Sequence, residues 1–175
     1  MLKYKIKVMN YFEAFKYVYN HCGYCKNKNF AIISIQEYSN EVMGVVYKPG
    51  GHLKAALNIH FSDLDKENSF HDNNPELNLM TEEDALKIKV FIDGINEFND
   101  LDELIIHCHA GVSRSAAVAA AILKVYNDDD SQIFDSENHA PNMYVYTQML
   151  KAYGLKNDGD IFLETSYSYN DKITF

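Results

Sequence analysis

The chain has 175 residues, 47% of them hydrophobic and 23% charged, with a formal net charge of −9 at pH 7. This length favours a single domain over residues 1–175, and the acidic charge, with no cluster of Lys or Arg, disfavours binding to nucleic acid or an anionic membrane. The longest apolar run, residues 116–123, is too short to span a bilayer, and residues 1–12 lack the apolar core of a signal peptide. Three cysteines cannot form a disulfide framework, so the expected location is the reducing cytoplasm.

The first predicted elements are a strand and a helix. Residues 3–9 (KYKIKVM) alternate Lys with Tyr, Ile and Val, which predicts a strand with one solvated face. Residues 11–19 carry aromatic side chains at helical spacing, which predicts a helix packed on a sheet. Cys22 and Cys25 follow this helix in a C-x-x-C pattern. The order of elements is the reverse of a thioredoxin-type site and no second ligand pair suits zinc, which leaves an incidental pair or a redox switch.

Three further strands are predicted next. Residues 30–36 (FAIISIQ) form a nearly continuous apolar run, typical of a central strand buried on both faces. Residues 42–47 suggest another strand before the turn-forming sequence KPGG at 48–51, and residues 53–61 predict a third. Residues 66–80 are polar and aperiodic, so they predict a long loop that either forms one wall of a pocket or is simply solvated.

A long helix leads into the next strand. Residues 81–84 (TEED) resemble a capping box, and the apolar residues that follow lie on one helical face up to about residue 98. A helix between two strands implies a right-handed crossover in a largely parallel sheet. We therefore predict an α/β fold of three layers, in which helices cover both faces of a four- or five-stranded, mostly parallel twisted sheet. Further on, 128–130 (DDD) predict a solvated turn and 143–153 a final helix that ends at Gly154.

The reactive residues lie in the turn between a strand at 104–106 and a helix at 113–123. Cys108 ends the strand, and Gly111 allows a reversal in which the N–H groups of 109–114 point into one concavity, together with the helix N-terminus. Such a site lowers the pKa of a thiol, and the guanidinium of Arg114 has the geometry to hold two phosphate oxygens. The alternative is that Cys108 is a buried structural thiol.

At these residues the sequence HCHAGVSRS (107–115) resembles the active-site loop of the cysteine-dependent protein tyrosine phosphatases, most closely the dual-specificity branch. A looser resemblance extends from Phe30 to about Leu150. It implies a protein tyrosine phosphatase-like fold and hydrolysis of phosphate monoesters through a phosphocysteine, with Cys108 as nucleophile, Arg114 as phosphate ligand and Ser115 assisting the departing thiolate. It also implies phosphate binding by the loop residues His109, Ala110, Gly111, Val112 and Ser113.

The resemblance also guides the choice of a general acid, which in the related phosphatases lies just after a strand, before the long helix. Asp63 fits this position best, Asp65 is second and Asp72 third. The plainer alternative for these side chains is an ordinary solvated loop carboxylate. His107 is either a core histidine or a residue that hydrogen-bonds beneath the loop and favours the Cys108 thiolate, and the resemblance favours the second role.

Three functions remain open from the sequence. The first is a phosphatase that needs no metal or cofactor and acts on a phosphorylated protein or peptide, since the loop lacks the lysines of some lipid phosphatases. The second is a phosphatase-like module that binds phosphorylated partners without hydrolysis. Sulfur or arsenate chemistry on a similar loop fits the Ala-Gly-x-x-Arg-Ser pattern less well. The sequence leaves the oligomeric state and the preferred phosphoresidue undetermined.

Overall fold

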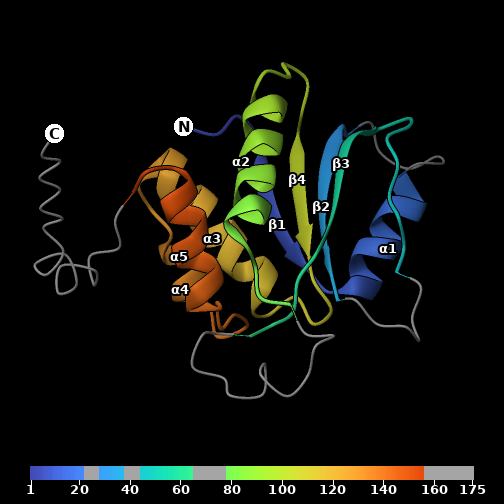
Figure 1. Cartoon of the computed structure of the whole chain (residues 1–175). Helices are drawn as coiled ribbons and strands as arrows, with labels where there is room; N and C mark the ends of the chain where they lie inside the picture. Colours follow the sequence, from blue (N-terminus) through green and yellow to red (C-terminus); the bar gives the residue numbers. More distant parts are fainter. Residues whose placement is uncertain (22–27, 38–43, 65–77, 156–175) are drawn as a thin grey trace, which may run out of the picture.

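The computed structural model describes residues 1–21, 28–37, 44–64 and 78–155. Within them, four parallel strands form one sheet in the order β1-β4-β2-β3 (Figure 1). The strands are β1 (Lys5–Met9), β2 (Phe30–Gln36), β3 (Leu53–His60) and β4 (Glu103–His107). The helices are α1 (Tyr11–His21), α2 (Glu82–Asn96), α3 (Arg114–Asn127), α4 (Ser131–Phe134) and α5 (Met143–Ala152).

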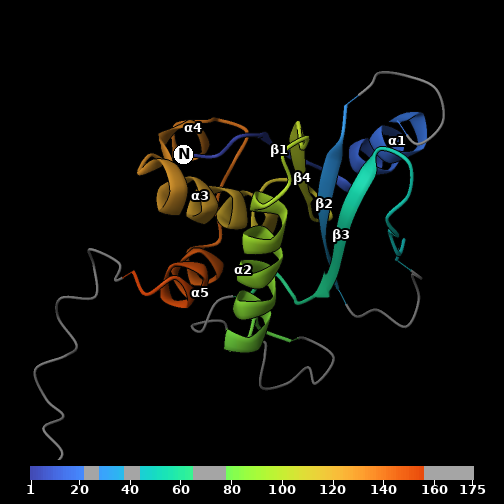
Figure 2. The ribbon, with the colours of Figure 1, turned by 90° about the horizontal axis from the view of Figure 1, so that it is seen from above.

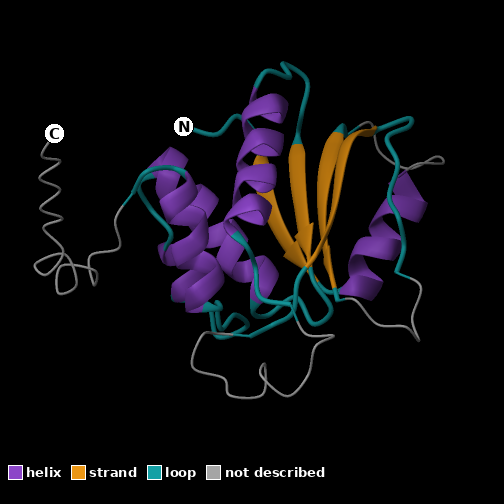
Figure 3. Cartoon of the chain, viewed as in Figure 1, coloured by secondary structure: helices purple, strands orange, loops and turns teal. Residues whose placement is uncertain are grey.

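The elements form three layers, as predicted. Helices α2 to α5 lie on one side of the sheet and α1 lies on the other, which is clearest when the views of Figure 2 and Figure 3 are compared. Alternate residues of the central strands face the two helical layers: Ile33 and Ile106 pack toward α2, α3 and α5, whereas Ile32 and Ile105 pack with Ala14 of α1. Because both faces are covered, every residue of β4 is buried, which explains the apolar run at its centre, residues 104–106.

The helix boundaries follow from local chemistry. Thr81 and Asp84 form the predicted capping box at the start of α2, because each side chain accepts a hydrogen bond from the backbone N–H of the other. Helix α3 ends at Asn127 and is capped by Asp128, which has a left-handed φ of 55°. The short helix α4, which follows this turn, was not predicted. No helix in the described ranges combines the length and apolarity needed to cross a membrane.

One predicted strand is wrong where the structure describes it. Residues 44–47, the described part of the expected strand at 42–47, are irregular. The side chain of Asn58 makes the hydrogen bonds to the backbone of Tyr47 that a neighbouring strand would make. Its Oδ1 accepts from the Tyr47 backbone N–H at 2.9 Å, and its Nδ2 donates to the Tyr47 carbonyl at 2.9 Å. The predicted Cys22 and Cys25 pair, and most of the predicted loop at 66–80, lie outside the described residues.

The parallel arrangement brings the carboxyl ends of three strands to one edge of the sheet. Glu37 follows β2, Phe61 to Asp63 follow β3, and Cys108 follows β4. In parallel α/β sheets, this edge is where ligands bind. The residues that the sequence analysis selected from different segments therefore have a common location, which is the lower edge of the sheet in Figure 1.

Candidate active site

The cysteine loop, residues 108–114, is held against the end of β1. Gly111 has a φ of 74°, and a Cβ atom there would lie 2.7 Å from the backbone nitrogen of Asn10. The N–H of Tyr11 donates to the carbonyl of His109 at 3.1 Å, which ties the start of α1 to the loop. Glycine is required here both for the left-handed backbone, which agrees with the reversal predicted at Gly111, and for the close approach, which was not predicted.

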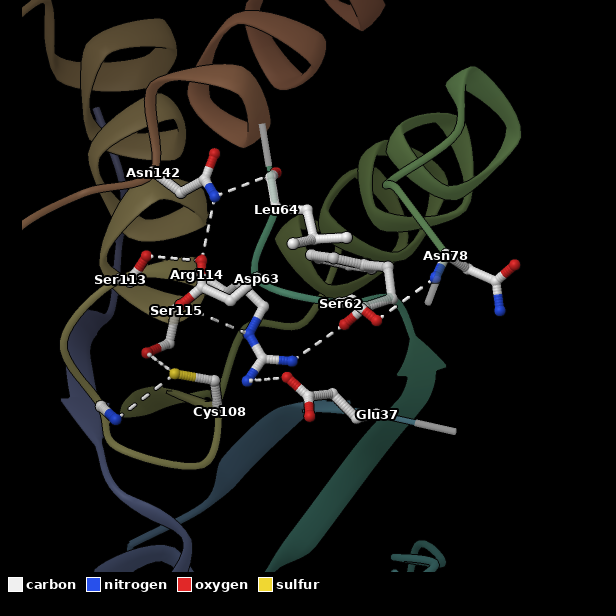
Figure 4. A network of polar contacts seen from close by, with 12 residues as sticks. Glu37, Ser62, Asp63, Leu64, Asn78, Cys108, Ser113, Arg114, Ser115 and Asn142 are labelled. Atoms are coloured by element: carbon white, nitrogen blue, oxygen red, sulfur yellow. Dashed lines mark hydrogen bonds and ion pairs between the residues drawn. The ribbon is translucent and has the colours of Figure 1, made fainter. Parts of the chain in front are cut away.

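Cys108 is 2% exposed, and its Sγ lies among hydrogen-bond donors. The Oγ of Ser115 is 3.1 Å from Sγ, and the N–H of Gly111 donates to Sγ at 3.3 Å (Figure 4). Burial raises the pKa of the Cys108 thiol, but the hydrogen bonds from Ser115 and Gly111 and the positive charge of Arg114 outweigh burial, so the net shift is downward. A thiol in this environment ionises more readily than a free cysteine, which makes it a better nucleophile at neutral pH.

Arg114 is 4% exposed and spans the space between the cysteine loop and the ends of β2 and β3. Its Nη1 donates to the carbonyl of Phe61 at 2.9 Å, and its Nη2 lies 3.0 Å from Oε1 of Glu37. Among the described residues, none accepts a hydrogen bond from its buried Nε, which lies 3.9 Å from Oδ2 of Asp63. A buried guanidinium with an unsatisfied donor suits an anionic ligand that brings its own acceptors.

Asp63, three residues beyond the end of β3, is held at the mouth of the site by two donors on the same oxygen. Ser113 Oγ donates to Oδ1 at 2.7 Å, and Asn142 Nδ2 donates to Oδ1 at 2.9 Å. Asn142 also donates to the carbonyl of Leu64 at 3.2 Å, while its Oδ1 accepts from the N–H of Val145 and so caps α5. These bonds fix the carboxyl group while its second oxygen, Oδ2, remains on the side of Arg114 (Figure 4).

His107 is buried beneath the loop, 1% exposed, between the rings of Tyr11 and Tyr47. Its Nδ1 is 3.3 Å from the carbonyl oxygen of Cys108, which is a hydrogen bond to the backbone and not to the thiol. Burial lowers the pKa of His107 to about 4, although the hydrogen bond opposes this shift. A neutral imidazole at physiological pH can orient the backbone of Cys108, but it supplies no positive charge to the thiolate.

Two cavities open onto this cluster and share the residues Glu37, Cys108, His109 and Arg114. The cavity of about 320 Å³ extends past Asp63, Ala110 and Ser113 and is the polar one. The cavity of about 370 Å³ extends along the apolar side chains of Tyr11, Phe12 and Ile35. A bound molecule can therefore place a polar group beside Arg114 while its remainder contacts an apolar wall.

The structure brings together Cys108, Arg114, Ser115 and Asp63, which the sequence analysis selected. Asp65 and Asp72, the alternative acids, lie outside the described residues. Two residues of this cluster, Glu37 and Asn142, were not predicted from the sequence. Glu37 follows an apolar strand directly, as Cys108 does, and this shared position was the signal available for it. Within the described segments, no three His, Cys, Asp or Glu side chains gather as a possible metal site.

Comparison with known proteins connects this arrangement to a fold. No protein-family model and no curated protein sequence matches the chain. A crystal structure of a human tyrosine phosphatase-like serine/threonine/tyrosine-interacting protein superposes with a TM-score of 0.54 and 19% sequence identity, covering 85% of this chain and 91% of that one. A mouse candidate dual specificity phosphatase, complexed with zinc tungstate, gives a TM-score of 0.42 and 18% identity over 84% of this chain and 80% of that one. The chain therefore has a tyrosine phosphatase-like fold, in agreement with the resemblance of its cysteine loop to the dual-specificity branch.

Proposed function

We propose that the protein is a cysteine-dependent phosphatase that hydrolyses phosphate monoesters on a phosphorylated protein or peptide. The observation that carries the proposal is the position of Cys108 Sγ between two hydrogen-bond donors, beside a buried Arg114 whose Nε has no acceptor among the described residues. A nucleophile and a phosphate ligand thus share one loop. Fold similarity alone would be weaker support, because one fold supports many functions.

In the first step, the thiolate of Cys108 attacks phosphorus, the S–P bond forms and the bond from phosphorus to the leaving oxygen breaks. Arg114 and the loop N–H groups stabilise the charge on the transferred oxygens. Asp63 gives its proton, carried on Oδ2, to the leaving oxygen, which departs as an alcohol or phenol. The position of Asp63 supports this role, because Asp63 and Arg114 line the same cavity as Cys108, and Oδ2 of Asp63 is on the side of the guanidinium.

In the second step, the Asp63 carboxylate takes a proton from water, and the oxygen of that water attacks phosphorus. The S–P bond breaks, inorganic phosphate forms and the electron pair returns to sulfur as the Cys108 thiolate. Ser115 Oγ, 3.1 Å from Sγ, stabilises the departing thiolate by a hydrogen bond. Neither step uses a metal or cofactor. Because a reactive thiolate survives only when it is kept reduced, we also propose that the protein acts in a reducing compartment such as the cytoplasm.

Hydrolysis of p-nitrophenyl phosphate by metal-free protein, measured across mildly acidic and neutral pH, tests this proposal. We expect turnover by the unmodified chain and none by Cys108→Ser. Rapid quenching of the reaction should trap phosphate on Cys108. Equal turnover by Cys108→Ser, or loss of turnover in metal-free buffer that is restored by a divalent metal, would contradict the mechanism.

A second candidate is a module that binds phosphorylated partners without hydrolysis. Asp63 has a structural role that needs no proton transfer and so fits this function, because its Oδ1 accepts hydrogen bonds from Ser113 and Asn142 and thereby links the cysteine loop to the start of α5. In addition, the human protein with the similar fold is described as phosphatase-like and as an interacting protein. Binding of a phosphopeptide with equal affinity by the unmodified chain and by Cys108→Ser, without turnover by either, would favour this function.

A further inference from the structure

We propose that the outer face of α1 is a docking surface for the apolar residues beside the phosphorylated residue of a peptide. This aromatic ridge consists of Phe12, Phe15 and Tyr19, and the proposal deepens the proposed function by specifying which phosphopeptides the site takes. It requires binding of a phosphopeptide, which both candidate functions include, and it does not require turnover.

The ridge is a continuous apolar stripe on an exposed helix face. Phe12, Phe15 and Tyr19 are spaced at i, i+3 and i+7, so they lie along one side of α1, and they are 70%, 45% and 76% exposed. The rings of Phe15 and Tyr19 stack, with centroids 6.5 Å apart and an interplanar angle of 12°. The sheet-facing side of α1 is filled separately by Ala14 and Val18. An amphipathic helix normally presents polar residues to solvent, so contiguous aromatic residues on this face indicate a binding surface.

The ridge is continuous with the candidate active site. Phe12, its first residue, lines the cavity that also contains Cys108 and Arg114. The hydrogen bond from Tyr11 N–H to the carbonyl of His109 fixes this end of α1 relative to the cysteine loop. From Phe12 to Tyr19 the helix rises about 10 Å, the length of roughly three extended residues. A peptide whose phosphate binds Arg114 can therefore leave the cavity past Phe12 and lay adjacent side chains on Phe15 and Tyr19.

The charges around this path select the kind of side chain that fits. Glu37 lines both cavities and Asp63 lines the polar one, and both carboxylates are partly exposed, so they oppose acidic residues next to the phosphate. On α1 itself, the exposed Glu13 and Lys16 beside the ridge offset each other, which leaves the aromatic rings as the dominant feature. We therefore infer a preference for apolar flanking residues, in place of the acidic flanks that a basic surface would select.

The first test compares two peptides on the Cys108→Ser chain, which cannot turn them over. Both are fluorescent phosphotyrosine peptides; one has Leu at about three positions on each side, the span of the ridge, and the other has Ser at the same positions. Fluorescence anisotropy should give about tenfold tighter binding for the Leu peptide. Equal affinities for the two peptides would overturn the docking proposal without any bearing on hydrolysis.

The second test determines whether Phe15 and Tyr19 cause the preference for the Leu peptide. Phe15→Ser combined with Tyr19→Ser, in the Cys108→Ser background, should reduce the ratio of the two affinities to about one. The matched control is Val90→Ser on α2, which removes an exposed apolar side chain (68% exposed) from the other side of the sheet and should leave the ratio at about ten. Persistence of the preference in the ridge variant would contradict the assignment to α1.

Two further outcomes separate this proposal from its alternatives. If sedimentation shows that the unmodified chain is a dimer and the ridge variant a monomer, the ridge is an interface between copies of this chain and the docking proposal is wrong. If the unmodified chain hydrolyses no p-nitrophenyl phosphate but the Leu peptide still binds more tightly, hydrolysis fails and docking stands. If the unmodified chain hydrolyses p-nitrophenyl phosphate but the two peptides bind equally well, hydrolysis stands and the docking proposal is wrong.

Discussion

Oε1 of Glu37 lies 3.0 Å from Nη2 of Arg114, so the guanidinium that we propose as a phosphate ligand is already paired with a carboxylate. The Arg114 side chain is 4% exposed and that of Glu37 is 46% exposed, so the pair joins a buried cation to a partly solvated anion. Nη2 has two hydrogens, and one of them can remain on Glu37 while phosphate binds the other together with Nε–H. The pair therefore orients Arg114 and also places a negative charge beside the incoming phosphate.

Glu37→Ala and Glu37→Gln should separate these two effects. Loss of the orienting contact in Glu37→Ala should lower kcat/KM for p-nitrophenyl phosphate about tenfold. Glu37→Gln keeps an acceptor for Nη2 but removes the charge, so it should retain most of the activity and bind inorganic phosphate more tightly. Inhibition by phosphate measures the second effect. The exposed Glu97→Gln is the control for a change in net charge alone, and an equal effect there would assign the result to long-range electrostatics.

Ser115→Ala should make the Cys108 thiol harder to ionise. The hydrogen bond from Ser115 Oγ is one cause of the lowered thiol pKa, so its removal should raise that pKa. The alkylation rate by iodoacetamide follows the thiolate fraction, so the whole rate profile should move to higher pH. Alkylation of Cys108→Ser gives the background from the other cysteines. An unchanged profile in Ser115→Ala would mean that Ser115 does not stabilise the thiolate.

Asp63→Asn should lower kcat by about 100-fold or more, the usual contribution of a general acid. Inorganic phosphate should still inhibit the variant, because Arg114 and the loop N–H groups are unchanged. Asp65→Asn is the matched comparison, and a larger loss there than in Asp63→Asn would show that Asp63 is not the acid.

Gly111→Ala and Gly154→Ala form a matched pair for the cysteine loop. Both glycines have a left-handed φ, 74° and 73°, but a Cβ at Gly111 would lie 2.7 Å from backbone atoms of Met9 and Asn10, whereas the space at Gly154 is open. Gly154→Ala should cost about 1–2 kcal/mol of unfolding free energy from backbone strain alone. Gly111→Ala should cost more and should abolish phosphate binding, as measured by thermal unfolding with and without phosphate. Equal losses would mean that the contact with β1 is unimportant.

Glu103 should make stability depend on pH at the opposite end of the sheet. This carboxylate is 1% exposed and is paired with Lys7 at 3.0 Å and Lys28 at 2.5 Å, with a further hydrogen bond from Tyr17. Burial opposes its ionisation, but these donors hold the pKa at about 2, below its usual value of 4.5. A lowered carboxyl pKa contributes stability above the unfolded value and loses it as the pH falls from about 4.5 to about 2.

We expect Glu103→Gln to unfold more easily at pH 7, by on the order of 3 kcal/mol, and to lose less stability than the unmodified chain below pH 4.5. Chemical denaturation at a series of pH values measures both effects. The comparison variant is Glu83→Gln, whose carboxylate is 78% exposed and paired with Lys87 on the surface of α2, and it should change little. Similar destabilisation in both variants would contradict the assignment to the buried network.

The cysteine loop could be predicted from sequence because its chemistry is local. A buried strand, a glycine that permits the reversal and an alanine-rich helix are adjacent in the chain, and their order determines where Cys108 and Arg114 lie. For Glu37, the only local signal was its position directly after an apolar strand, and Asn142 could not be found in this way. Asn142 and Asp63 are 79 residues apart in sequence, and periodicity gives the face of an element but not which elements meet at their ends.

The errors in the predicted fold have a similar origin. Residues 45–47 have the composition of a strand, but the Asn58 side chain makes hydrogen bonds to the backbone of Tyr47. The strand propensities of individual residues cannot predict such a tertiary contact. Helix α4 is only 4 residues long, which is too short to show a helical period. In contrast, the largely apolar strand β2, the apolar centre of β4 and the capping box of α2 agree with the sequence, because local preference and burial favour the same structure there.

The burial of α3 has a mechanical consequence for the cysteine loop. Residues 114–123 of this helix are all buried, and most of them are alanines and other small side chains that allow close packing on the sheet. Closely packed interiors have low compressibility and transmit displacements to whatever is attached to them. A larger side chain in the middle of this helix would therefore push the loop as well as the core. The geometry of the proposed anion site therefore depends on the close packing of α3, so mutations that are remote from the site and touch no ligand can still alter it.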